Sequence, residues 1–253
     1  MRTTVVTGAA SGIGAATAAA CAAAGGRVLG IDRAGAEIVA DLSTPDGRVG
    51  AARAVSELSD GRIDAVIACA GVSSGDPANT VSINFFGSTA LVAALRPLLE
   101  AGEDPRAVII SSEALLLGYD PATLQACLDG DEPAARAAAS AAEPHLAYNT
   151  SKMAIARWVK REAVKAEWAA SGVLLNAVAP GVVATPMIQQ LLDTEEGRDM
   201  LGKATPMRVG RWAQPAELAR LLAFLASPDN SFMVGQTVFC AGGAEATLRP
   251  EQV

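Results

Sequence analysis

Short apolar runs alternate with longer segments of helical spacing along most of the chain. The short runs are rich in apolar and often β-branched residues, so we predict that they form strands buried on both faces. They are residues 3–7, 27–31, 64–70, 106–111, 173–179 and 236–240. The longer segments, which we predict to be helices, are residues 12–24, about 46–59, 78–99, 147–170 and 215–226.

This alternation predicts an α/β fold. Strands that alternate with helices form a parallel sheet wrapped by helices, and right-handed crossovers make it a doubly wound, Rossmann-type sheet. The chain has no recognisable linker, internal repeat or low-complexity tail, so we expect residues 1–253 to form a single domain.

One segment, residues 119–144, interrupts the alternation. It contains two helical pieces. The first ends at Gly130, and the second begins with Asp131 as a cap and Pro133 in its first turn. We therefore expect a small helical insertion on the carboxyl side of the sheet.

Charge and cysteine content exclude several classes of protein. The net charge of −7 opposes binding to a phosphate backbone, so no nucleic-acid partner is expected. The four cysteines form no CxxC pair and are interpreted as reduced thiols of a cytoplasmic protein. Glycines interrupt the N-terminal apolar stretch, which argues against a signal peptide, and no apolar run free of charges and glycines is long enough to span a membrane.

The stretch TGAASGIG, residues 7–14, follows the first predicted strand and opens the first predicted helix. Glycines at this place allow a pyrophosphate to approach the backbone and the positive end of the helix. The spacing is Gly8-x-x-x-Gly12-x-Gly14, which differs from the GxGxxG pattern. The alternative interpretation is a glycine-rich turn that only packs the helix.

Asp32 favours the nucleotide interpretation. It lies 18 residues beyond Gly14, at the end of the second predicted strand. A carboxylate there accepts hydrogen bonds from the adenosine ribose and repels a 2′-phosphate, so NAD is expected rather than NADP. Arg33 beside it would partly accommodate that phosphate, and Asp32 also fits a helix cap or a turn.

The stretch YNTSK places Tyr148 and Lys152 four residues apart, on the same side of a helix. An ammonium near a phenol favours the phenolate, so we expect the pKa of Tyr148 to be lowered. A shift from the usual ~10 to ~7 needs about 4 kcal/mol, which the lysine and an oxidised nicotinamide would supply jointly. Such a tyrosine exchanges a proton with an alcohol or ketone. Alone, the pair also fits an exposed helix face.

Further short motifs follow in order: CAG at 69–71, NFFG at 84–87, IISS at 109–112 and PGVVATPM at 180–187. With TGAASGIG and YNTSK, they resemble the short-chain dehydrogenase/reductase family along nearly the whole chain. The resemblance implies an oxidoreductase in which Tyr148 is the general acid/base, Lys152 holds the nicotinamide ribose and Ser112 orients the substrate oxygen. It also implies that Asn84 holds a water that links Lys152 to a proton relay.

The same resemblance implies which residues bind the cofactor, while the hydride chemistry belongs to the cofactor itself. Gly8, Ser11, Gly12, Ile13 and Gly14 would line the pyrophosphate, and Asp41 and Leu42 would bracket the adenine. The remaining contacts are expected from Ala70, Gly71, Pro180, Gly181, Val183 and Thr185, with Val183 binding the carboxamide through its backbone. With a single histidine in the chain, no metal site is expected.

Two features depart from the family pattern. Cys69 stands where the family commonly has asparagine, so other groups must supply the missing hydrogen bonds. Ser112 and Tyr148 are 36 residues apart, a wider separation than usual, and the 119–144 insertion accounts for the excess. The insertion and residues 30–48 resemble the 3α-hydroxysteroid dehydrogenase/carbonyl reductase branch. That branch implies a homodimer built from about 214–226 and 236–240.

Several residues allow other interpretations. We expect His145 to lie on the surface and the three tryptophans to serve packing. The apolar residues of 187–201 fit either a lid over the substrate or the core, and Leu115, Leu116 and Leu117 are candidates for the same pocket.

Three functions are compatible with these motifs. The first is an NAD(H)-dependent oxidoreductase for a hydrophobic secondary alcohol or its ketone, such as a 3α-hydroxysteroid or a cyclic or aryl carbonyl. The second is a catalytically silent NAD-binding sensor, against which the complete set of Asn84, Ser112, Tyr148 and Lys152 argues. The third is an epimerase or dehydratase, which usually carries a larger C-terminal substrate domain than the 13 residues after Cys240.

Overall fold

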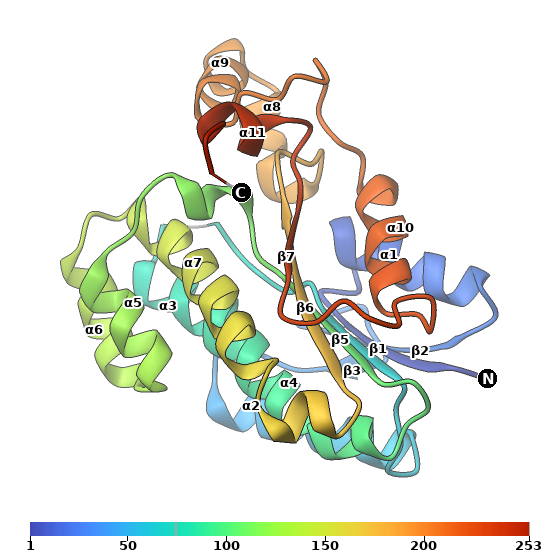
Figure 1. The fold of residues 1–253 in the computed structure, drawn as a ribbon. Coiled ribbons are helices and arrows are strands. Elements are labelled where there is room, and N and C mark those ends of the chain that lie inside the picture. Colours follow the sequence, from blue (N-terminus) through green and yellow to red (C-terminus); the bar gives the residue numbers. More distant parts are fainter. Residues whose placement is uncertain (74, 253) are drawn as a thin grey trace.

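The computed structural model describes residues 1–73 and 75–252 and contains one parallel sheet (Figure 1). Its strand order is β3-β2-β1-β4-β5-β6-β7, with every neighbouring pair parallel. The strands are β1 (Thr3–Thr7), β2 (Arg27–Asp32), β3 (Ile38–Val39), β4 (Ala65–Ala68), β5 (Arg106–Ile110), β6 (Leu174–Pro180) and β7 (Thr237–Cys240). The order reverses between β1 and β4, and ligands bind at the carboxyl ends of strands beside such a reversal.

Helices cover both faces of this sheet (Figure 1). One face carries α1 (Gly12–Ala23) and α10 (Pro215–Leu225), which contact each other. The other face carries α2 (Pro45–Leu58), α4 (Gly87–Glu100) and α7 (Leu146–Glu162). The predicted doubly wound α/β fold is thereby confirmed.

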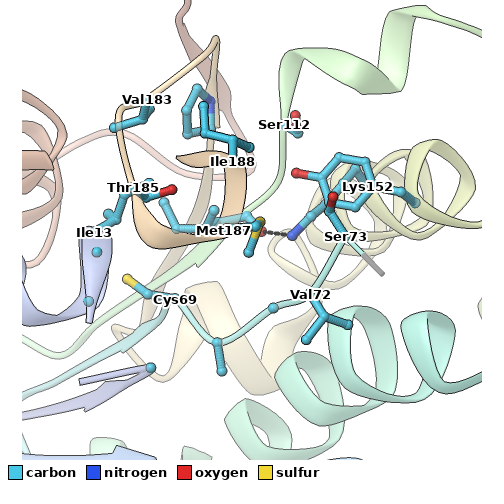
Figure 2. Close-up of a pocket in the computed structure, with 18 of the residues that line it drawn as sticks. Ile13, Cys69, Val72, Ser73, Ser112, Lys152, Val183, Thr185, Met187 and Ile188 are labelled. Atoms are coloured by element: carbon cyan, nitrogen blue, oxygen red, sulfur yellow. Dashed lines mark hydrogen bonds between the residues drawn. The ribbon is translucent and has the colours of Figure 1, made fainter. Parts of the chain in front are cut away.

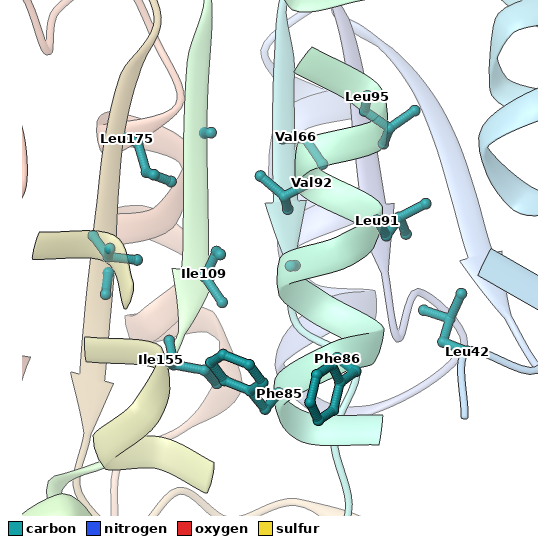
Figure 3. Close-up of a cluster of buried hydrophobic side chains, with 14 of the residues drawn as sticks. Leu42, Val66, Phe85, Phe86, Leu91, Val92, Leu95, Ile109, Ile155 and Leu175 are labelled. Carbon is teal, nitrogen blue, oxygen red and sulfur yellow. The ribbon is translucent and has the colours of Figure 1, made fainter. Parts of the chain in front are cut away.

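Each face has its own apolar core. The cluster beneath α2, α4 and α7 includes Leu91, Leu95 and Ile155 packed on β4 and β5, with Phe85 and Phe86 edge to face at its end (Figure 3). The smaller cluster beneath α1 and α10 includes Val6, Ile67 and Leu222. Strands buried on both sides have few polar positions, which explains the continuous apolar runs in the sequence.

Residues 119–144 form α5 (Pro121–Asp129) and α6 (Glu132–Ala141), which lie outside α3 (Pro77–Val81) and α7 (Figure 1). Gly130 ends α5 with a φ of +76°, and the Asp131 side chain caps α6. Arg48 of α2 forms an ion pair with Glu132 at the start of α6. The insertion is therefore attached to the helical layer rather than to the sheet.

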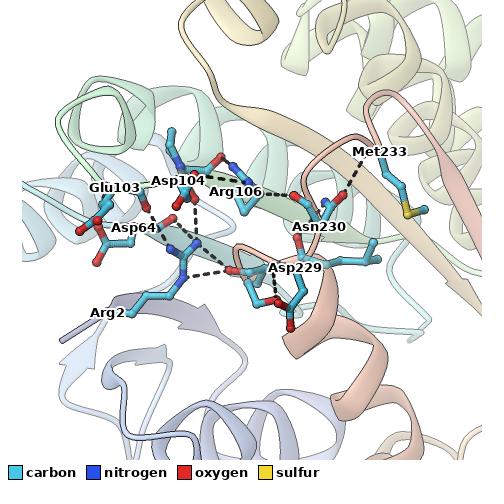
Figure 4. Close-up of polar contacts among 12 residues, drawn as sticks. Arg2, Asp64, Glu103, Asp104, Arg106, Asp229, Asn230 and Met233 are labelled. Carbon is cyan, nitrogen blue, oxygen red and sulfur yellow. Dashed lines mark hydrogen bonds and ion pairs between the residues drawn. The ribbon is translucent and has the colours of Figure 1, made fainter.

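Buried charges meet at the amino ends of the strands (Figure 4). The Asp64 carboxylate accepts hydrogen bonds from the backbone N–H groups of Thr3 at 2.7 Å and Glu103 at 2.8 Å. The Arg106 guanidinium donates to the Asn230 carbonyl at 2.6 Å, and Arg2 donates to four backbone carbonyls. We call Arg2, Asp64, Arg106 and Asn230 the amino-end network.

Three differences from the predicted elements have local causes. β3 was not predicted, because its two residues are too few for a visible pattern. The predicted helix 147–170 is two elements, because Lys165 adopts an extended conformation between α7 and η3 (Ala166–Ala170). The predicted helix 78–99 is a continuous run made of α3, a π-helical turn η1 (Ser82–Phe86) and α4.

That continuous run, Pro77–Glu100, is long and apolar enough to cross a membrane by composition. However, 67% of its most apolar window is buried inside the protein, as in a helix that packs against a core. It is the single such helix within residues 1–73 and 75–252.

The carboxyl ends of the strands are covered by short elements (Figure 1). They are η2 (Glu113–Leu116), η4 (Pro186–Ile188), α8 (Gln189–Leu192), α9 (Glu195–Ala204) and α11 (Ala244–Leu248). Residues of η2, η4, α8 and α9 line the cavity described next.

Candidate active site

The glycine loop takes its shape from contacts that exclude side chains. A Cβ on Gly14 would lie 2.1 Å from the Gly8 carbonyl oxygen, and Gly8 itself has a φ of +68°. The backbone of β1 can therefore turn directly into α1 only with glycine at both places. The Ser11 side chain makes no capping hydrogen bond to α1, so the first N–H groups of the helix are available to an anion. This cradle fits a pyrophosphate.

The acidic residues lie where the adenosine end of a dinucleotide would be expected. Asp32, at the end of β2, accepts hydrogen bonds from the backbone N–H groups of Ala10 at 3.0 Å and Arg33 at 2.7 Å. These bonds fix its carboxylate at the rim of the cavity beside the glycine loop. The exposed Asp41 and the buried Leu42 line the same rim.

All the sequence-predicted site residues except Asn84 line one cavity of about 400 Å³. In Figure 2, Ser112 and Lys152 lie on one side of this cavity and Ile13 and Thr185 on the other. Ser112 follows β5, and Val183 and Thr185 follow β6, so the ends of neighbouring strands bring them together. This is the edge of a doubly wound sheet at which ligands bind.

The α7 helix holds Tyr148 and Lys152 on one side. Lys152 is buried, and its Nζ donates to the Ile110 carbonyl at 3.1 Å (Figure 2). The same Nζ lies 5.6 Å from the centroid of the Tyr148 ring. Burial lowers the pKa of Lys152 to about 8, so the ammonium still predominates at pH 7.

The expected lowering of the Tyr148 pKa is wrong for the protein's own groups. Burial raises the pKa of the Tyr148 phenol, the Glu113 carboxylate raises it further, and a hydrogen bond with Ser112 opposes the rise. The lysine that carried the expectation lies over the ring face, and its Nζ is engaged with Ile110. The prediction counted Lys152 and the oxidised nicotinamide and omitted burial.

Asn84 lies behind the cavity in the π-helical turn η1 and is fully buried. Its Oδ1 accepts from the Val72 N–H at 2.8 Å, and its Nδ2 donates to the Val72 carbonyl at 2.9 Å and to the Ser151 hydroxyl at 3.1 Å. Oδ1 and Lys152 Nζ would lie 3.1 Å and 3.6 Å from a Cβ on Gly71. Asn84 therefore fixes the chain after β4 close to the amine.

These contacts also explain how the chain accommodates Cys69. The Ala70 N–H donates to the Thr7 hydroxyl at 2.9 Å, so Thr7 and Asn84 anchor the segment on both sides of Gly71. Burial raises the pKa of the Cys69 thiol to about 12, which keeps it protonated. No group of three metal-ligating side chains occurs among the residues that the structure describes.

The segment after β6 covers the cavity. Met187, Ile188, Leu191 and Leu201 line it, so this segment contributes to the pocket rather than to the core. Of the three leucines after Ser112, Leu117 lines the cavity and Leu115 is buried. His145 lies on the surface, paired with Glu143 at 3.4 Å.

Sequence reasoning missed Glu113. It is the residue after Ser112, only 1% of it is exposed, and it lines the cavity. Its Oε1 is buried without a hydrogen-bond partner among the described residues. Burial raises the pKa of this carboxyl to about 6. The available signal was an acidic residue directly after a buried strand that ends in two serines.

Comparisons with known proteins agree with this site. The family model described as short chain dehydrogenase matches residues 2–123, and the one described as Enoyl-(Acyl carrier protein) reductase matches residues 134–245. The chain is 40% identical to 3-alpha-hydroxysteroid dehydrogenase/carbonyl reductase of Comamonas testosteroni, covering 98% of both chains. It is 30% identical to coniferyl-alcohol dehydrogenase of Pseudomonas sp. strain HR199, covering 96% of both.

Among solved structures, the chain superposes with a TM-score of 0.92 on the 3-alpha-hydroxysteroid dehydrogenase of Pseudomonas sp. B-0831 complexed with NADH. The two are 38% identical, and the match covers 99% of this chain and all of the other. The protein belongs to the short-chain dehydrogenase/reductase family. It is an oxidoreductase with a fold that binds a nicotinamide cofactor.

Proposed function

We propose that this protein interconverts a hydrophobic secondary alcohol and its ketone with NAD(H), and that Tyr148 is its general acid/base. The observation that carries the proposal is the single cavity lined by Ser112, Tyr148 and Lys152 together with the glycine loop, with Ser112 and Lys152 across from Ile13 (Figure 2). Apolar residues from 187–201 line the same cavity, which favours a hydrophobic substrate. A 3α-hydroxysteroid or a cyclic or aryl carbonyl is the proposed class, supported by the two relatives named above.

The chain's own residues would move one proton during alcohol oxidation. The Ser112 hydroxyl orients the carbinol oxygen, and the Tyr148 oxygen takes its proton. When bound, the oxidised nicotinamide would supply the hydride acceptor. Lys152 holds the nicotinamide ribose, and Asn84 holds a water between the amine and solvent. Because the protein's groups raise the Tyr148 pKa, the lowering needed near neutral pH depends on the positive charge of the oxidised nicotinamide.

The proposed cofactor is NAD rather than NADP. Asp32 stands at the rim with its carboxylate fixed by two backbone N–H groups, where it would receive the ribose hydroxyls and repel a 2′-phosphate. The NADH complex of the related dehydrogenase supports the same preference. Gly8, Gly12 and Gly14 would hold the pyrophosphate, and Val183 would hold the carboxamide.

We further propose a cytoplasmic homodimer. The four thiols are free, as expected in a reducing compartment. Phe224 of α10 is 42% exposed and Phe232, before β7, is 95% exposed, which supports an interface built from α10 and β7. A shift of the sedimentation coefficient on Phe232→Ser would test this assembly.

The decisive experiment follows NADH formation by absorbance over a 3α-hydroxysteroid, an aryl alcohol and a monoterpenol, with Tyr148→Phe as the control. We expect the variant to lose at least about a thousandfold in kcat/KM while it still binds NADH. Turnover of the aryl alcohol or monoterpenol alone would keep the mechanism and discard the steroid assignment. Turnover that Tyr148→Phe retains would contradict the role of Tyr148. NADH binding without turnover of any substrate would favour the silent sensor.

A further inference from the structure

The carboxyl group of Glu113 is the part of the site that the proton transfer leaves unused. Glu113 begins η2, directly after Ser112, and lines the same cavity as Tyr148. It is 1% exposed, and its Oε1 is buried without a hydrogen-bond partner among the described residues. Other charged side chains in this part of the molecule are engaged, since Lys152 donates to Ile110 and Asp32 accepts two backbone bonds.

The protein does not compensate this charge. Among the described residues, Thr205, at the end of α9, is the one neighbour that favours the ionised form of Glu113. The cations among the described residues that line the cavity are Arg33, which is exposed and interacts with Asp41, and Lys152, which is bound to a carbonyl. Burial raises the pKa of Glu113 to about 6, so near neutral pH the group is ionised and accepts hydrogen bonds only.

A buried acceptor without a partner destabilises the fold, and an apolar side chain would fill the same place without that cost. The nearby lining is apolar and includes Leu117, Met187 and Leu201. A carboxylate in such a wall is selective, because it favours a ligand that brings a donor and disfavours one that leaves the oxygen unpaired.

We propose that Glu113 determines substrate specificity by accepting a hydrogen bond from a second donor group on the substrate, a hydroxyl or an ammonium, in addition to the carbinol at Ser112 and Tyr148. This inference rests on the proposed function and narrows its substrate class. The substrate is a secondary alcohol on a hydrophobic frame that carries another hydrogen-bond donor.

The test uses matched pairs of alcohols that differ in this donor alone. In the first set, 1-phenylethanol is paired in turn with each of its ring-hydroxylated derivatives, and a ring-aminomethyl derivative supplies the ammonium. A second pair is two 3α-hydroxysteroids with a ketone or a hydroxyl at the far end. The quantity compared is the ratio of kcat/KM for the donor-bearing member to kcat/KM for the other member.

In the wild-type protein we expect this ratio to be at least about tenfold for one donor position. Glu113→Leu should bring it close to one. Glu113→Gln keeps the shape and one acceptor but removes the charge, so it should reduce the ratio more for the ammonium than for the hydroxyl. The glutamine variant decides the question if the leucine variant does not fold.

Thr205→Val is the matched control, because it removes the neighbour of the carboxyl and keeps the carboxyl itself. If Glu113 binds substrate, Thr205→Val retains the wild-type preference. If Glu113 only holds α9 in place through Thr205, this variant changes the ratio as Glu113→Leu does, and the inference is wrong.

Failure of the inference and failure of the proposed function are distinguishable. Tyr148-dependent turnover with no preference for any donor-bearing member, or with the same preference in Glu113→Leu, would overturn the role of Glu113 alone. Absence of Tyr148-dependent turnover for every compound would overturn the proposed function and this inference with it.

Discussion

Buried charged groups occur at both ends of the parallel strands, but their hydrogen bonding differs. At the amino ends, Asp64 and Arg106 are each about 4% exposed (Figure 4). Both Asp64 oxygens accept from backbone N–H groups, Arg106 Nε and Nη1 donate to backbone carbonyls, and Arg106 Nη2 pairs with Asp104 at 3.8 Å. At the carboxyl ends, Glu113 keeps an unpaired oxygen, and the Lys152 ammonium, which has three N–H donors, makes one hydrogen bond within residues 1–73 and 75–252.

This difference separates stabilising groups from functional ones. A fully bonded buried charge holds chain segments together, whereas a partly bonded one retains capacity for a ligand. Arg2 and Asp64 join β1 to the chain before β5, which are far apart in the sequence. Glu113, Tyr148 and Lys152 join nothing comparable. Burial displaces their pKa values toward the neutral form, as it does those of Arg2 and Arg106, so the two ends differ in hydrogen bonding and not in burial.

Replacement of one buried cation at each end gives the sharpest test. Lys152→Met should lower kcat/KM by about a thousandfold, because the amine that holds the ribose and favours the phenolate is lost. Its free energy of unfolding at pH 7 should change by no more than about 1 kcal/mol, because an amine disfavoured by burial is removed. Initial rates and urea denaturation measure the two effects.

Arg106→Met should have the opposite outcome. It leaves the Asn230 carbonyl without its donor, and removal of one member of a buried network costs about 3 kcal/mol. Urea denaturation should record this loss, whereas KM at low temperature should stay within about threefold of wild type. Equal loss of stability in the two methionine variants would contradict the comparison.

Glu113 supplies a pH-dependent test. Burial in the folded state raises its pKa from the usual 4.5 to about 6, so the folded state binds the proton more tightly than the unfolded state. Stability from this group is present below pH 4.5 and is lost as pH rises to about 6, a change of about 2 kcal/mol. Glu113→Gln should therefore exceed wild type in free energy of unfolding at pH 7.5 but match it near pH 4.

This sign is opposite to that of Asp64. Burial alone would raise the Asp64 pKa, but hydrogen bonds from Glu103 and Thr3 outweigh burial and lower it. Its contribution is present at neutral pH and is lost as pH falls below 4. The difference in free energy of unfolding between Glu113→Gln and wild type should therefore widen as pH rises. If it narrows instead, Glu113 behaves as Asp64 does, and the two ends do not differ.

Asp32 should give the smallest effect. Asp32→Ser removes the carboxylate that opposes a 2′-phosphate, and the exposed Arg33 beside it remains. We expect the ratio of kcat/KM for NADP⁺ to that for NAD⁺ to rise by about tenfold, or ~1.4 kcal/mol. Glu37→Gln, on the same exposed segment, is the control for net charge. An equal rise in both variants would mean that the effect is nonspecific.

Sequence patterns were sufficient to predict helices with several buried turns and strands of several residues. The runs at 3–7 and 106–111 are apolar because both faces are covered, and the glycines at 8 and 14 are required by contacts within the loop. The two-residue β3 and the break at Lys165 had no such pattern, because neither depends on hydrophobic periodicity.

The candidate site was predictable where a motif carries it. Tyr148, Lys152 and Ser112 line one cavity, as the motif order indicated. The direction of the Tyr148 pKa was not predictable from the Lys152 spacing, because burial and Glu113 act through the fold. Glu113 belongs to no motif, and its significance depends on an unpaired atom that a sequence cannot reveal.

The π-helical turn at Ser82–Phe86 has a consequence for insertions and deletions. A π turn holds one more residue than the α-helical turn it replaces, so it offsets the helix on one side of it by about 100°. Deletion of one residue from this turn would leave an unbroken α-helix still able to pack Leu91 and Leu95 on the sheet. Asn84 would then rotate away from Val72 and Ser151. A deletion of a single residue would therefore disrupt the site and leave the packing of the core intact.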